Sequence, residues 1–84
     1  MKAGAAMTNS EIYQDAIKTF GERSQIIKAI EELNELSTAL ARYLNNIGDS
    51  ENIAEELADV EVMCEQLCMI FKNRVEVLKV KQAK

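Results

Sequence analysis

Apolar residues recur along this chain at the three- and four-residue spacing of amphipathic helices, with few interruptions. The pattern predicts four helices, over residues 10–20, 22–45, 51–72 and 75–84. Gly21 and Asn73 separate the short helices from the long ones, and the segment 46–50 forms the loop between the two long helices. The chain has no Pro and is 5% aromatic, which favours helix over sheet. The predicted fold class is therefore all-α.

The expected architecture is one all-α domain over residues 10–84, preceded by a flexible N-terminus over residues 1–9. Ser10 is the expected N-cap of the first helix, and Asp49 or Ser50 that of the third. Two long helices joined by a tight loop predict an antiparallel hairpin, which the short flanking helices extend toward a four-helix bundle. Because a chain of 84 residues buries a modest fraction of its surface, we expect it to assemble as an oligomer.

Composition restricts the chemistry that such a fold can perform. The chain has no His, which excludes His-based acid–base catalysis and the Ser-His-Asp and Cys-His nucleophiles. Its net charge of −4 argues against a nucleic-acid polymer as partner, because binding one requires a basic surface. Cys64 and Cys68 match no redox motif and are expected to be reduced core thiols of a cytoplasmic protein. With no long apolar run and no signal-peptide pattern, no membrane association is expected.

Acidic residues on the predicted core faces carry the functional signal. Each long helix has a pair of acids at positions i and i+3, which share one helix face: Glu32 with Glu35, and Glu56 with Asp59. At about 100° per residue, Glu56 falls in the middle of the apolar stripe and Asp59 about 60° away, at its edge. Glu32 lies at the margin of the stripe on its own helix, and Glu35 just outside it. At least one carboxylate is therefore expected inside the helix contact.

Carboxylates in such positions need partners, because burying an unpaired one costs several kcal/mol. Lys28 lies one turn before Glu32 and can pair with it, but no base accompanies Glu56 and Asp59 on their stripe. A hard cation such as Mg²⁺ or Mn²⁺ prefers oxygen ligands and would satisfy both pairs together in an antiparallel hairpin. The alternative is that the acids form interhelical salt bridges or lie at the surface.

The same residues resemble the signature of the all-α nucleoside triphosphate pyrophosphohydrolases of the MazG-like type. That signature is EExxE, a variable spacer and ExxD. Here it reads Glu31-Glu32-x-x-Glu35, a spacer of 20 residues, and Glu56-x-x-Asp59. The surrounding stretches QIIKAIEELNEL and NIAEELADVEVMCEQL are also similar to the two core helices of the family. The resemblance covers about residues 22–72.

The resemblance implies Mg²⁺-dependent hydrolysis of an NTP or dNTP to the monophosphate and pyrophosphate, with Mn²⁺ as a substitute. It implies four metal ligands, Glu32, Glu35, Glu56 and Asp59. The implied catalytic residues are Glu31 and Glu32. Family members often hold phosphates with a Lys/Arg-bearing segment after the last helix, and the candidates here are Lys28, Lys79 and Lys81. The resemblance also implies a homodimer or homotetramer.

Two other functions fit the sequence. The first is a non-catalytic helical interaction module, in which the acids determine pairing specificity. Alternatively, the chain belongs to a branch of the same superfamily with a dedicated substrate, such as dUTP, dCTP or phosphoribosyl-ATP. Base selectivity would then depend on residues outside the acid cluster, with Tyr13, Phe20 and Gln25 as candidates.

Overall fold

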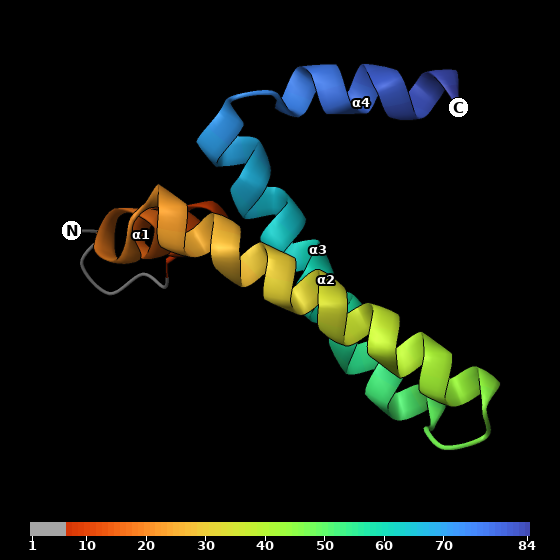
Figure 1. The fold of residues 1–84 in the computed structure, drawn as a ribbon. Coiled ribbons are helices and arrows are strands. Elements are labelled where there is room, and N and C mark those ends of the chain that lie inside the picture. Colours follow the sequence, from red (N-terminus) through yellow and green to blue (C-terminus); the bar gives the residue numbers. More distant parts are fainter. Residues whose placement is uncertain (1–6) are drawn as a thin grey trace.

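The computed structural model describes residues 7–84, which form four α-helices and no strand (Figure 1). In chain order these are α1 (Asn9–Phe20), α2 (Glu22–Leu44), α3 (Ser50–Phe71) and α4 (Arg74–Ala83). The predicted all-α fold is confirmed, and each predicted helix boundary lies within about one residue of the observed one. Most of the expected flexible segment 1–9 lies outside the described residues.

The N-terminus of α1 corrects one prediction. Thr8, and not Ser10, is the N-cap: its Oγ1 accepts a hydrogen bond from the Glu11 N–H at 3.1 Å. In return the Thr8 N–H donates to the Glu11 carboxylate at 3.2 Å, which completes a capping box. Thr8 has a Glu three residues later, whereas Ser10 has Tyr13. The prediction that Ser10 caps this helix is wrong for that reason.

Local backbone geometry fixes the other helix boundaries. Gly21 joins α1 to α2 with φ 89° and ψ 152°, a conformation that side-chain-bearing residues avoid. Asp49 caps α3, as predicted, by accepting a hydrogen bond from the Asn52 N–H at 2.8 Å. Lys72 ends α3 in the left-handed conformation, with φ 53° and ψ 45°, and Asn73 then precedes α4. Lys72 and Asn73 therefore turn the chain sharply between α3 and α4.

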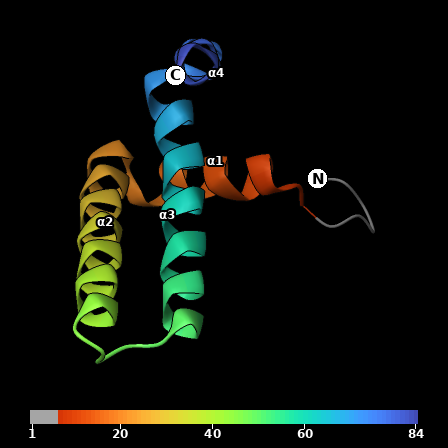
Figure 2. The same cartoon turned by 90° about the vertical axis from the view of Figure 1, so that its right-hand side faces the viewer.

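Helices α2 and α3 lie side by side and run in opposite directions (Figure 2). Helix α1 contacts both of them, near the N-terminus of α2. The residues buried in this contact come from both long helices: Gln25, Ala29, Ala39, Met63 and Gln66. Because two of the three buried α2 residues are small alanines, α3 can lie close to α2 at those positions. This is the surface on which the acidic residues of the two helices meet.

Among the described helices, α4 contacts α3 alone and points away from the α2–α3 pair (Figure 1). Large apolar side chains remain exposed on α2, including Ile30, Leu33 and Leu40. Cys64 is also exposed, and Cys68 is half-buried. The prediction of a buried thiol is wrong for Cys64, because it lies at the edge of the α3 stripe, where α2 does not cover it. None of the described helices combines the length and apolar character needed to cross a bilayer.

Candidate metal centre

Three carboxylates converge between α2 and α3. Glu32 and Glu35 extend from α2 and Glu56 from α3, and one oxygen of each lies within 4.8 Å of the others. We call these three residues the acidic triad. The spacing i, i+3 brings the two α2 side chains to one face, and the antiparallel packing brings Glu56 opposite them. Two ligand oxygens of one Mg²⁺ lie at most about 4.2 Å apart, so the triad is close to the size that a cation requires.

The surroundings of Glu32 disfavour its charged form. Its side chain is 14% exposed, and its Oε1 lies 3.7 Å from Nζ of Lys28. Its Oε2 is fully buried and has no hydrogen-bond partner among the described residues. Burial is the main cause that raises the pKa of Glu32 above its ordinary value, followed by the negative charges of Glu35 and Asp59, and Lys28 opposes the shift. One surface lysine thus leaves Glu32 incompletely neutralised.

Glu56 occupies the position that the helical wheel predicts. It is half-buried, as are Ile53 and Val60, its neighbours one turn away on either side. Its Oε2 is fully buried and lacks a hydrogen-bond partner within the described part of the chain. A buried carboxylate oxygen without a partner is costly, so this atom and its counterpart on Glu32 favour a positive group bound between them. These two buried oxygens show that the residues of the acidic triad are suited to bind a hard cation.

The structure does not bring every predicted site residue to the triad. Asp59 is exposed and outside the 4.8 Å cluster, although its charge still acts on Glu32. Glu31 is exposed on α2. The two lysines of α4, Lys79 and Lys81, are exposed on a helix that does not contact α2 in the described chain. Their predicted role in phosphate binding stays a prediction.

A groove next to the triad contains residues that the sequence reasoning missed. It has a volume of about 300 Å³, and its lining includes Glu35 and Glu56 together with Asn34, Thr38, Arg42 and Asn52. The sequence contains a signal for two of these residues, Thr38 and Arg42. Glu35, Thr38 and Arg42 follow the spacing i, i+3, i+7, which places them on one face of α2.

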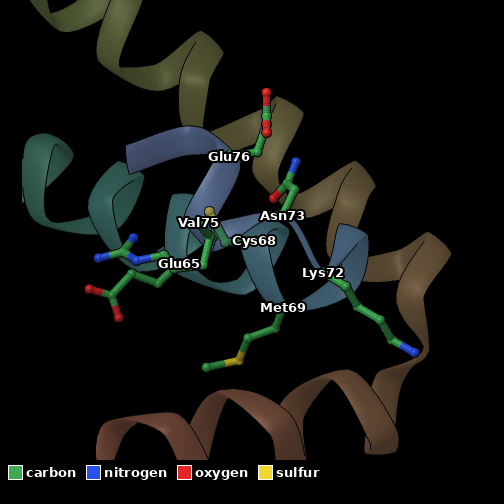
Figure 3. Close-up of a pocket in the computed structure, with 8 residues that line it drawn as sticks. Glu65, Cys68, Met69, Lys72, Asn73, Val75 and Glu76 are labelled. Atoms are coloured by element: carbon green, nitrogen blue, oxygen red, sulfur yellow. The ribbon is translucent and has the colours of Figure 1, made fainter. Parts of the chain in front are cut away.

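A larger cavity of about 640 Å³ lies at the corner between α3 and α4 (Figure 3). Cys68 and Met69 line it from α3 and Val75 from α4. Its charged side chains diverge, with Glu65 and Lys72 on opposite sides of the view and Glu76 pointing in a third direction. A cation needs several oxygens directed at one point, so this cavity does not match the predicted chemistry.

Comparisons of the chain with protein-family models, with curated proteins and with solved structures find no match. The resemblance to the MazG-like pyrophosphohydrolases therefore depends on the acidic motifs and the stretches of sequence around them. Fold and site together define an all-α chain with a partly buried carboxylate cluster between its two long helices.

Proposed function

We propose that this chain is a Mg²⁺-dependent pyrophosphohydrolase that converts an NTP or dNTP to the monophosphate and pyrophosphate. The observation that carries the proposal is the acidic triad, in which two fully buried carboxylate oxygens lack a partner among the described residues. Carboxylates are ligands that Mg²⁺ and Mn²⁺ prefer. A polyphosphate is the ligand that most needs such a cation, because its own charge is strongly negative.

In the proposed reaction, water forms a bond to the α-phosphorus and the bond to the β-phosphate oxygen breaks, which releases pyrophosphate. When bound, Mg²⁺ supplies charge neutralisation and polarisation of the phosphate. The residues that would hold it are Glu32, Glu35, Glu56 and Asp59. From the resemblance, Glu31 is proposed to take the proton of the attacking water and Glu32 to orient that water; of the two, Glu32 belongs to the triad and Glu31 is its exposed neighbour on α2. No His is required in this scheme.

The proposal includes a homodimer or homotetramer that completes a four-helix bundle. The support is a second apolar stripe on α2, beside the one that faces α3, at 26, 30, 33, 40 and 44. Ile30, Leu33 and Leu40 of this stripe are 45–53% exposed. Lys79 and Lys81 would reach a triad only in such an assembly, because α4 contacts α3 alone among the described helices. We place the protein in the cytoplasm, where its free cysteines would stay reduced.

A panel of NTPs and dNTPs with Mg²⁺ and pyrophosphate detection tests the proposal, and dUTP, dCTP and phosphoribosyl-ATP in the panel test a dedicated substrate. The Glu56→Gln variant is expected to lower pyrophosphate release by about 100-fold or more, because it removes a ligand charge. Glu55→Gln is the matched control, since Glu55 is the exposed neighbour on the same helix. Pyrophosphate release that is unchanged in Glu56→Gln contradicts the site, and no release from any substrate contradicts the activity.

The exposed apolar stripe of α2 also favours a second candidate, a non-catalytic helical interaction module. In that case Glu56→Leu raises the melting temperature, because an apolar group replaces an unpaired buried charge. Millimolar Mg²⁺ would then leave the melting temperature unchanged. A rise in melting temperature with Mg²⁺ that is lost in Glu56→Gln but kept in Glu55→Gln argues for the metal site, because a ligand of the native state stabilises it.

A further inference from the structure

The groove beside the acidic triad differs in charge along its length. One end has the carboxylates of Glu35 and Glu56, which belong to the triad. The neutral hydrogen-bonding residues Asn34, Thr38 and Asn52 also line it, and Arg42 is the one cation among its described lining residues. Such a groove suits an anion with several charged groups. One end of the anion would bind a cation held by the acids, and the other end would bind the guanidinium of Arg42.

Arg42 has no salt-bridge partner within the described part of the chain. It lies in the last turn of α2, where a cation also interacts favourably with the helix dipole. The dipole alone does not require the side chain to lie in the groove, since any position around the last turn would serve. Arg42 is instead on the same face as Glu35 and Thr38, two turns and about 10.5 Å along the axis from Glu35. That separation leaves room for phosphate groups between the triad and the guanidinium.

The loop after α2 holds Arg42 at a fixed position. The Arg42 carbonyl oxygen accepts hydrogen bonds from the Ile47 N–H at 2.9 Å and from the Asn45 N–H at 3.1 Å. The loop also passes so close that a Cβ placed on Gly48 would lie 3.6 Å from Cβ of Arg42. These contacts restrain the backbone from which the guanidinium extends, which lowers the entropy lost when it binds a ligand.

From this groove we infer that Arg42 binds the terminal phosphates of the substrate and retains the pyrophosphate product, with Asn34, Thr38 and Asn52 as neutral donors. The inference rests on the proposed function, because the triad must hold the cation that bridges to the same phosphates. Arg42 lies between the two acidic motifs of the same chain, and it takes the phosphate-binding role in place of Lys79 and Lys81. A guanidinium suits this role because it donates two parallel hydrogen bonds to phosphate oxygens.

Binding of inorganic pyrophosphate in the presence of Mg²⁺, measured by calorimetry, tests the inference without catalysis. We expect Arg42→Ala to raise the dissociation constant by about 10- to 100-fold, the range for a lost hydrogen bond to a charged group. Arg42→Lys should recover part of the loss, because it keeps the charge without the bidentate geometry. Arg23→Ala is the matched control, since Arg23 is the other arginine of α2, is exposed and lies outside the groove.

The same variants are then assayed for pyrophosphate release from the best substrate of the panel. Arg42→Ala is expected to raise KM and to weaken product inhibition by pyrophosphate, with only a small change in melting temperature, because Arg42 is exposed and the lost dipole interaction is partly offset by the helix propensity of Ala. If Arg42→Ala binds pyrophosphate as tightly as the wild type while the wild type is active, the inference is overturned and the proposed function stands. If the wild type releases no pyrophosphate from any substrate, the proposed function itself fails.

Discussion

At the scale of single residues, the acidic triad brings like charges together, and Glu32 shows the consequence most clearly. The two oxygens of Glu32 have different surroundings: Lys28 lies 3.7 Å from one, and the other is buried without a partner among the described residues. An ion pair with a lysine that is 57% exposed contributes little, because solvent screens it. The buried oxygen must therefore be satisfied by a cation or by a proton.

The pH dependence of stability follows from this residue. The pKa of Glu32 is raised above its ordinary value of 4.5, mainly by burial. Well below pH 4.5 the carboxyl is protonated in both states, so no penalty exists there. As the pH rises, the unfolded chain releases its proton first, and the free energy of unfolding of the metal-free protein falls until the folded pKa is passed. We expect Glu32→Gln to melt higher than the wild type at pH 7 and to lose this advantage at pH 4.

Thermal unfolding in the presence of a chelator, at pH 4 and pH 7, measures the effect. Glu31→Gln is the control, because it removes an exposed charge from the adjacent position. A melting-temperature difference between Glu32→Gln and wild type that is the same at both pH values would show that the carboxyl carries no burial penalty.

At the scale of helices, the sequence predicts the fold well because the signals that begin and end each helix are local. Gly21, the loop around Gly48 and the Asp49 cap act within a few residues, and the boundaries follow from them. The wheel also placed Glu56 inside the contact face, since periodicity alone determines that. The prediction chose Ser10 over Thr8 because both are residue types that cap helices, and it did not use the capping-box partner Glu11, which distinguishes them.

The packing and register of one helix against another could not be predicted from the sequence. Arg42 and Asn52 share a groove because of the register between α2 and α3, to which spacing within one helix contributes nothing. The direction of α4 depends on the left-handed backbone of Lys72, a residue type that normally avoids it. The predicted phosphate role of Lys79 and Lys81 came from the family resemblance and not from a position in space, and in the described chain α4 contacts α3 alone.

The junction between α1 and α2 gives a prediction at this scale. Gly21 has φ 89° and ψ 152°, although a Cβ there would meet no atom within 4 Å. Gly21→Ala is therefore strained by its backbone and not by a clash, and we expect a loss of about 1–3 kcal/mol. Gly48→Ala is the control: its added Cβ makes ordinary contacts from 3.6 Å, and its φ is not positive, so a change within about 0.5 kcal/mol is expected. Urea unfolding of both variants measures the difference, and equal losses would contradict the assignment of strain to Gly21.

At the scale of the whole molecule, the chain has two apolar seams on one helix. The first seam follows a three-four spacing at 25, 29, 32, 36, 39 and 43, and Gln25 and Glu32 are its polar members. The second seam is the exposed apolar stripe at 26, 30, 33, 40 and 44, one position later. The first seam faces α3 and includes the buried Ala29 and Ala39. The second contains Ile30, Leu33 and Leu40, each 45–53% exposed. Two adjacent seams with this period are typical of a helix that packs against two neighbours.

The exposed seam predicts self-association that is coupled to folding. Ala29, Ala39 and Met63 are the buried apolar residues of the described part of this 84-residue chain, so the core there is small, and pairing the seams of two copies would enlarge it. We expect a dimer or tetramer by light scattering and a melting temperature that rises with protein concentration.

Leu33→Glu places a charge in the seam and should give a monomer that melts lower. Ser24→Glu adds the same charge to an exposed position on the opposite side of α2 and should leave the assembly intact. A wild-type monomer with a concentration-independent melting temperature would overturn the prediction, because the seam of one copy would then not bind the seam of another.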